Sequence, residues 1–362
     1  MKRRNQICIL LLASLFVFSC TEKKNNVTPP GEFDLKAMMQ PVPRTAKFIN
    51  DTSYIWCGSM TRSDKDKKYH LFYSRWNRKH GFHSWVTHSE IAHAVSDSAE
   101  GPFEFKDVAL PPRGAEYWDG MVTHNPNICH FGDKYYLYYM GNRGDGKIGT
   151  QLNWTHRNNQ RIGVAVADDP NGPWQRFDAP VIDVSPDSTA YDALMTSNPT
   201  VTKMPDGRYL AIYKAVGKKN PMPFGGPVVH LTAIADSPTG PFVKQNKPIF
   251  TAGEDVLFPA EDPFVWWQDN CFYAVVKDQK SYFINAGRSL VLFYSLNGVD
   301  WKLAKHPLVT TLQINWVDGI QKKLEAVERP QVFVENGKPR ILCVAVKEVD
   351  SNHSYNVQIP LK

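Results

Sequence analysis

The sequence predicts an all-β fold, a five-bladed β-propeller with four antiparallel strands in each blade. Two observations support this prediction: a β-hairpin motif recurs five times along the chain, and a second turn motif recurs in step with it. No amphipathic helical period interrupts the strand-like segments. Self-similarity at a fixed period, with four short strands in each unit, is typical of β-propellers.

The hairpin motif starts with two polar residues and a proline, and continues through a strand, a tight turn and a second strand. Four copies start at His124, Ser197, Glu261 and Glu328, and their prolines lie 73, 64 and 67 residues apart. A degenerate copy without the proline spans Trp56–Trp76. Five hairpins predict five blades.

The second motif is a turn that follows the third strand-like run of each unit. It reads DSAEGPF from Asp97, DDPNGPW from Asp168 and DSPTGPF from Asp236, with LNGVDW from Leu296 as a weaker fourth copy. Each turn precedes a further short strand, which completes four strands per unit. A two-sheet sandwich would not explain hairpins that stay in register with these turns.

The two chain ends predict how the ring closes. The last copy ends at Ser354–Leu361, which is only its third strand. We expect the segment around Ala46–Asn50 to supply the missing outer strand, because this removes the exposed sheet edges. The propeller domain is therefore expected over residues 46–362.

The N-terminus has the pattern of a secretory signal. Basic residues 2–4 precede an apolar run, Ile7–Phe18, that is too short to span a bilayer. The following Val17–Cys20 resembles the lipobox of bacterial lipoproteins. This resemblance implies a signal peptide over 1–19, a lipid on Cys20, a tether over 20–45 and a place at the outer membrane of the bacterial cell envelope, on the periplasmic or surface side. An ordinary cleaved signal is the alternative.

Composition excludes some partners and cofactors. The net charge of +6 is spread without a basic block, so we expect no nucleic-acid partner, and membrane contact only through the lipid anchor. Cysteines 57, 129, 271 and 343 lie in apolar runs without CxxC spacing, which favours buried thiols over disulfides or zinc. Histidines 88, 93, 124 and 230 have no tight ligand spacing; we expect no cofactor, although a divalent metal in the channel remains an alternative.

Propeller topology predicts where a ligand site lies. The first strands of the blades line the channel, and the second strands run back, so the starts of the first and the ends of the second meet at one mouth. The residues before each proline form one set: His124–Asn125, Ser197–Asn198, Glu261–Asp262 and Glu328–Arg329, with Gly58–Ser59 approximately equivalent in the first copy. The ends of the second strands form the other: Arg75, Asn142, Lys214, Lys277 and Lys347. This mouth is the expected binding pocket.

Two loops that enter first strands add aromatic and carboxylate pairs. Trp118 and Asp119 precede one proline at the same distance as Tyr191 and Asp192 precede the next. Aromatic faces beside carboxylates suit a sugar site, because rings pack on C–H patches while carboxylates transfer protons. Capping of turns is the structural alternative for both aspartates.

From about Phe48 to the end, the chain resembles the five-bladed propeller glycoside hydrolases, with families 43 and 117 closest. The features that carry the resemblance are the [ND]P motifs, the GPF turns and the secretion signal. It implies a glycosidase acting on oligosaccharides, with Glu261 as general acid. Asn198 stands where family 43 has an aspartate, and the first blade offers no carboxylate at 57–59. The similarity to family 117 makes His124 an alternative acid.

The expected mechanism uses two carboxylates across the mouth. Glu261 would protonate the leaving oxygen, with its pKa raised by Asp262 and Glu328. Asp119 or Asp192 would activate water, which implies inversion if the separation leaves room for that water. A salt bridge between Glu261 and Arg329 is the structural alternative.

The cations of the mouth suggest the substrate. Arg75, Lys214, Lys277, Arg329 and Lys347 predict an acidic oligosaccharide, or phosphate as co-substrate, unless each cation neutralises a neighbouring carboxylate. Two further functions stay open: a glycan phosphorylase similar to family 130, and a sugar-binding lipoprotein without catalysis.

Overall fold

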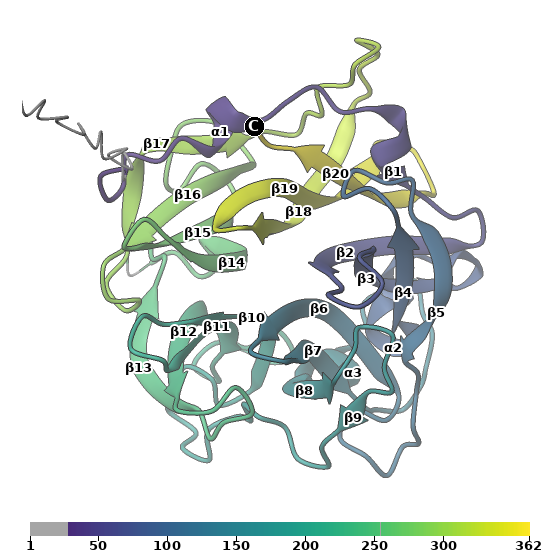
Figure 1. Cartoon of the computed structure of the whole chain (residues 1–362). Helices are drawn as coiled ribbons and strands as arrows, with labels where there is room; N and C mark the ends of the chain where they lie inside the picture. The colour runs from purple at the N-terminus through teal and green to yellow at the C-terminus, as the bar shows by residue number, and fades with distance from the viewer. Residues whose placement is uncertain (1–27, 254) are drawn as a thin grey trace, which may run out of the picture.

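The protein is a ring of five sheets around one axis (Figure 1). The structure is a computed structural model, and it describes residues 28–253 and 255–362. Each sheet has four antiparallel strands, so the predicted five-bladed propeller is confirmed. In the described chain, short helices occur in the segment before β1 and in connections between strands.

The first two blades follow each other along the chain. The first blade contains β2 (Ser53–Arg62), β3 (Tyr69–Asn77), β4 (Glu90–Ser96) and β5 (Glu104–Leu110). The second blade contains β6 (Val122–Phe131), β7 (Lys134–Asn142), β8 (Arg161–Ala167) and β9 (Gln175–Arg176).

The remaining three blades repeat this order. The third contains β10 (Met195–Lys203), β11 (Tyr209–Val216), β12 (Val228–Ala235) and β13 (Val243–Ile249). The fourth contains β14 (Ala260–Gln268), β15 (Cys271–Asp278), β16 (Ser289–Ser295) and β17 (Lys302–Thr310). The fifth contains β18 (Leu324–Glu335), β19 (Lys338–Glu348) and β20 (Ser354–Pro360), with β1 (Lys47–Phe48) as its outer strand.

Strand β1 closes the ring. Lys47 pairs with Val357 and Phe48 with Asn356, antiparallel to β20. The prediction that the segment around 46–50 completes the last blade is therefore confirmed.

The described part of the predicted tether packs on the propeller. Residues 28–45 include α1 (Leu35–Met38), and Phe33, Leu35 and Val42 are buried against the fourth and fifth blades. Backbone bridges join Met39 to Leu361 and Val42 to Trp316. Apolar side chains at these positions explain why this stretch is part of the folded domain rather than a spacer.

The predicted signal peptide and Cys20 lie outside the described residues. No helix within 28–253 and 255–362 is long and apolar enough to cross a membrane.

Each innermost strand has a β-bulge at the same place, and β18 has two further register shifts. At each bulge one residue has a positive φ, between 50° and 56°: Cys57, Asn125, Asn198, Asp262 and Arg329. A bulge with a left-handed residue bends the strand and redirects its side chains. The result is that five equivalent side chains turn to the axis.

Hydrogen bonds between neighbouring blades follow directly after these bulges. In three successive blades, the side chain two residues past the bulge accepts a bond from a backbone N–H of the next blade. The donor and acceptor pairs are Ile128 and Ser59 (3.0 Å), Val201 and Asn127 (2.9 Å), and Val265 and Thr200 (3.1 Å). These bonds fix the angle between blades, and so the shape of the mouth.

Replacing Thr200 with valine tests this bond. Thr200→Val keeps the side-chain shape but leaves the buried Val265 N–H without an acceptor, so we expect a loss of about 1–3 kcal/mol in unfolding free energy. The measurement is urea unfolding. Thr202→Val, at a half-buried position on the same strand, is the control and should change stability by less than about 0.5 kcal/mol. Equal effects of both variants would contradict the interblade role.

Candidate functional site

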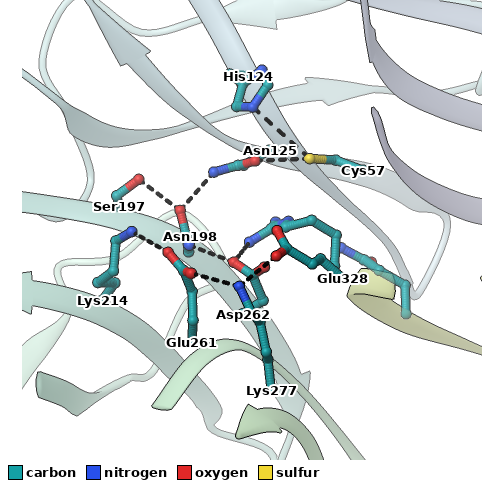
Figure 2. Close-up of polar contacts among 12 residues, drawn as sticks. Cys57, His124, Asn125, Ser197, Asn198, Lys214, Glu261, Asp262, Lys277 and Glu328 are labelled. Carbon is teal, nitrogen blue, oxygen red and sulfur yellow. Dashed lines mark hydrogen bonds and ion pairs between the residues drawn. The ribbon is translucent and has the colours of Figure 1, made fainter. Parts of the chain in front are cut away.

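The five bulge residues surround the axis and are joined in series by four hydrogen bonds, and we call this set the axial ring; Figure 2 labels four of its members. Cys57 Sγ donates to Asn125 Oδ1 at 2.9 Å, and Asn125 Nδ2 donates to Asn198 Oδ1 at 2.6 Å. Asn198 Nδ2 and Arg329 Nη1 both donate to Asp262 Oδ1, at 2.7 and 2.8 Å. All five side chains are buried. The expectation that Asn125, Asn198, Asp262 and Arg329 meet at one axis is confirmed.

A pocket of about 130 Å³ lies at this ring, and its two walls differ in chemistry. One wall is aromatic and comes from the first blade and its connection: Trp56, Trp76, Phe82 and Trp85. The opposing residues come from the third to fifth blades and are charged: Lys214, Glu261, Asp262, Glu328 and Arg329. The pocket therefore offers apolar ring faces together with hydrogen-bonding groups.

Glu261 on β14 is an ionised carboxylate held by two lysines. Lys214 Nζ lies 2.9 Å from its Oε1, and Lys277 Nζ lies 3.2 Å from its Oε2. Gln279 Nε2 also donates to Oε2, at 2.9 Å. Burial alone would raise the pKa of Glu261, but the two ammonium groups outweigh it and hold the pKa well below its usual range.

This geometry corrects two expectations for Glu261. Its pKa is lowered, not raised by Asp262 and Glu328, because the two lysines are closer partners. The alternative salt bridge with Arg329 is also not formed, since Arg329 pairs with Asp262 at 2.8 Å.

Glu328 on β18 is the carboxyl group with the opposite shift. Burial raises its pKa; Lys277, whose Nζ lies 2.5 Å from Oε1, opposes this, while Glu261 and Asp262 add to it. The same Lys277 ammonium thus contacts both glutamates, as Figure 2 shows. Neighbouring carboxyl groups with pKa values pushed apart can serve as a proton donor and an ionised partner.

The cations of the pocket are already neutralised. Lys214 pairs with Glu261, Lys277 with both glutamates and Arg329 with Asp262. This arrangement is the alternative in which each cation neutralises a neighbouring carboxylate. The axial pocket therefore has no excess positive charge among its described residues to recruit an acidic sugar.

His124, on β6 of the second blade, packs against the aromatic wall. Its ring stacks on Trp85 with centroids 4.9 Å apart, and its Nδ1 lies 2.7 Å from Ser89 Oγ. Burial, assisted by the charges of Arg329 and Lys214, lowers the pKa of His124 well below its usual value. The neutral imidazole can hydrogen-bond a sugar, but it is a poor match for the general acid considered above.

Asp119 lies away from the pocket, so it does not fit the expected role of base. It is fully buried, 2.7 Å from Arg113 Nε, 2.6 Å from the Tyr139 hydroxyl and 3.5 Å from Arg176 Nη1. Its neighbour Trp118 stacks on Tyr139 with centroids 5.8 Å apart.

Asp192 repeats this arrangement in the third blade. Lys244 Nζ lies 2.6 Å from its Oδ2, and the Tyr213 hydroxyl donates to the same atom at 3.2 Å. The equal spacing of Asp119 and Asp192 from their prolines therefore marks a repeated structural ion pair, formed with side chains and not by capping of a turn.

Strand register decides which second-strand cations reach the mouth. Lys214 pairs with Ser197 and Lys277 with Glu261, directly before the bulges. Arg75 lies one residue further along its strand, where it pairs with Glu90 at 2.8 Å. Lys347 lies two residues further, forms an ion pair with Glu325 and faces the Phe82 ring at 5.6 Å. Of these second-strand cations, only Lys214 and Lys277 contact Glu261 or Glu328.

Sequence reasoning missed three aromatic residues of the pocket. Trp56 stands directly before Cys57, so it is the first-blade equivalent of Glu261 and Glu328. Because this copy lacks the proline, the sequence predicted the equivalent pair at 58–59, two residues too late. Trp76 and Phe82 complete the wall with Trp85, and their clustering within 76–85 was the available signal.

Residues 28–253 and 255–362 contain no group of three or more His, Cys, Asp or Glu side chains that could hold a metal ion. Cys57, Cys271 and Cys343 are free and buried, as predicted, and Cys129 is free and half-buried.

Comparisons with known proteins show the fold. No family model and no curated protein matches the chain. A solved family 117 glycoside hydrolase of Zobellia galactanivorans is 19% identical with a TM-score of 0.59, over 86% of this chain and 84% of that one. The arabinanase Arb43A of Bacillus subtilis is 16% identical with a TM-score of 0.55, over 85% and 94%. A thermostable family-43 glycoside hydrolase is 14% identical with a TM-score of 0.55, over 89% and 91%. The chain thus has the propeller fold of these glycoside hydrolases.

Replacing Asn198 with aspartate tests the axial ring. Asn198→Asp puts a carboxylate where the amide now donates to Asp262, so we expect a loss of about 2 kcal/mol or more in unfolding free energy at pH 7.5. Repulsion from Asp262 raises the pKa of the new carboxyl group above that in the unfolded chain. The folded variant then binds the extra proton as the pH falls, and its deficit relative to the unchanged protein should shrink at pH 5.

The measurement is denaturant unfolding at both pH values. Asn246→Asp, at an exposed position on β13, is the matched control and should show little change. If Asn198→Asp were as stable as Asn246→Asp at both pH values, the hydrogen bond from Asn198 to Asp262 would not contribute to stability as predicted.

Proposed function

We propose that the protein hydrolyses glycosidic bonds of oligosaccharides at the channel mouth. The single observation that supports this most is the glutamate pair with opposite pKa shifts, set against an aromatic wall. Sugar rings present apolar C–H faces, which pack on aromatic rings, and hydroxyl edges, which need hydrogen-bonding partners. The fold shared with arabinanases and a family 117 enzyme adds support by analogy.

The proposed proton donor is Glu328, in place of Glu261. Its raised pKa favours the protonated acid, which can protonate the leaving glycosidic oxygen. Glu261 stays ionised, and its negative charge stabilises the positive charge that develops at the anomeric carbon. Water then forms the new C–O bond at that carbon and gives its proton to the ionised Glu328, which restores the acid. Lys277 contacts both groups and keeps them on one side of the sugar.

The family 130-type phosphorylase has weaker support. A phosphate co-substrate needs cations that are free to bind it, whereas Lys214, Lys277 and Arg329 already pair with carboxylates. Sugar binding without catalysis is the second candidate. It is favoured by the contacts of Glu261 with two lysines and Gln279, which restrain a carboxylate that hydrolysis would use.

Glutamine variants of the pair test the assignment. Incubation with arabinan oligosaccharides and a broader glycan panel should show hydrolysis, and Glu328→Gln should lower kcat by about 100-fold or more, because the amide has no proton to donate. Glu325→Gln, an exposed change on the same strand, is the control and should retain turnover. Full activity of Glu328→Gln would exclude the assignment. Binding without turnover in the unchanged protein would favour the second candidate.

The pH profile gives an independent test of the donor. Because the pKa of Glu328 is raised above its usual 4.5, activity should persist above that pH and fall as the pH rises through the raised value. A donor with the lowered pKa of Glu261 would lose its proton, and activity, at a much lower pH. If the residual activity of Glu328→Gln fell at the same alkaline pH as that of the unchanged protein, Glu328 would not be the proton donor.

We also propose that Cys20 carries a lipid and anchors the protein to the bacterial envelope. Labelled palmitate should enter the full-length protein in cells, and Cys20→Ala should abolish labelling and move the protein to the aqueous phase of a detergent partition. Cys8→Ala, in the signal, is the control. Membrane association that survives Cys20→Ala would contradict the anchor.

A further inference from the structure

Four ionisable side chains form a hydrogen-bonded chain in the first blade, and none of them lines the axial pocket. Asp66 Oδ1 lies 3.2 Å from His70 Nε2, and His70 Nδ1 lies 2.8 Å from His93 Nε2. His93 Nδ1 then lies 3.2 Å from Asp107 Oδ1. Both imidazole rings are buried, whereas the Asp107 side chain is 47% exposed. The chain therefore has three polar contacts, and its Asp107 end reaches solvent.

Three contacts of this kind need three protons. Each hydrogen bond uses one N–H or O–H, which points from a donor to an acceptor. Two neutral imidazoles carry one N–H each, and two ionised carboxylates carry none. One of the three contacts therefore brings two acceptors together, in whichever direction the rings are protonated. A third proton removes this repulsion.

Asp66 is the end of the chain that stays ionised. Its carboxylate accepts further hydrogen bonds from the Lys68 backbone N–H at 2.9 Å and from Asn171 Nδ2 at 3.3 Å. Burial alone would raise the pKa of Asp66, but these bonds and that from His70 outweigh it and hold the pKa well below its usual range. The His70 Nε2–H therefore donates to Asp66, which leaves His70 Nδ1 as an acceptor.

Asp107 is the end of the chain that lacks a proton. Because His70 Nδ1 accepts, His93 donates through its Nε2–H, and its Nδ1 has no hydrogen to offer Asp107. Burial lowers the pKa of His93 to about 3. Burial also raises the pKa of Asp107, although Lys106 and His70 oppose this shift. An added proton therefore belongs on the Asp107 carboxyl group, which then donates to His93 Nδ1.

Two other charged groups act on the rings, in opposite directions. The Lys106 ammonium, on β5, disfavours a positive charge on either ring, while the Asp169 carboxylate, in the turn between β8 and β9, favours it. Asp169 is itself paired with Lys65 at 3.5 Å. Tyr73, on β3 near Asp107, stays neutral because burial raises its pKa. Burial thus remains the main influence, and it keeps both rings neutral.

The chain also contacts the second blade. Asn171, which donates to Asp66, lies in the turn between β8 and β9. His93 stacks on Phe72 with ring centroids 4.7 Å apart, and Trp174 of the same turn meets Phe72 edge to face at 5.4 Å. A hydrogen bond gained or lost inside the chain therefore acts on the junction between the first two blades.

We propose that Asp66, His70, His93 and Asp107 form a proton-binding chain, which takes up a third proton at Asp107 in acid and then stabilises the junction of the first and second blades. The inference is independent of the proposed glycosidase activity. A group whose pKa is higher in the folded than in the unfolded chain stabilises the fold below its unfolded pKa, and this contribution is lost as the pH rises through the folded pKa. The contact of Asp107 with His93 is therefore favourable in acid and repulsive at alkaline pH.

Replacing Asp107 with asparagine supplies the missing donor at every pH. The amide of Asp107→Asn can donate to His93 Nδ1, so the unfolding equilibrium constant should be about fivefold lower than that of the unchanged protein at pH 8. The difference should shrink at pH 4.5, where the unchanged protein gains its own donor. The measurement is denaturant unfolding of both proteins at each pH. Both contain the same two histidines, so the protonation of these rings in the unfolded chain cancels in the comparison.

Glu104→Gln is the matched control, because it neutralises an exposed carboxylate on the same strand outside the chain, and it should match the unchanged protein at both pH values. No gain in stability from Asp107→Asn at pH 8, or a gain of the same size at pH 4.5, would overturn the proposal. Nitrogen-15 resonances of the histidine rings give a second readout. His70 and His93 should both carry hydrogen on Nε2 at pH 8, and a hydrogen on His93 Nδ1 would also overturn it.

Discussion

The left-handed residue at each innermost bulge is the constraint on which the site depends. A positive φ is uncommon for residues other than glycine, although Asn and Asp tolerate it better than most. Cys57 and Arg329 have no such preference, yet both adopt it. They are held by neighbours in the ring, Cys57 by Asn125 and Arg329 by Asp262. Backbone strain of this kind persists only where the surroundings fix it, and here the surroundings are the other bulge residues. The ring and the five bulges therefore stabilise each other.

One consequence is that two neighbouring residues in each blade have different roles. The bulge residue of each blade forms the ring, while the residue before it faces the mouth or its rim. This second position holds Trp56, His124, Ser197, Glu261 and Glu328 in the five blades. Its chemistry changes from aromatic to charged around the axis, and this change produces the two walls of the pocket. A propeller can thus vary its ligand chemistry at one position per blade without altering the ring.

Much of the fold could be predicted because its signals are local. Turn residues and alternating runs repeat along the chain, so blade number, the closing strand and the meeting of His124, Glu261 and Glu328 all followed from the sequence. Side-chain direction did not follow as easily. An offset of one or two residues moved Arg75 and Lys347 away from the central carboxylates, and the copy without a proline hid Trp56. The pKa shift of Glu261 depends on Lys214, 47 positions away, so no local pattern contained it.

The contrast between the two glutamates has a simple origin in the repeat. Each carboxylate at this position faces the second-strand residue of its own blade and that of the preceding blade. For Glu261 these are Lys277 and Lys214, and both are cations. For Glu328 they are Ala345 and Lys277, so only one is a cation. The alanine in the fifth blade therefore leaves Glu328 with a single ammonium, which does not offset its burial and the nearby negative charges. A single second-strand position thus decides which glutamate of the pair can hold a proton.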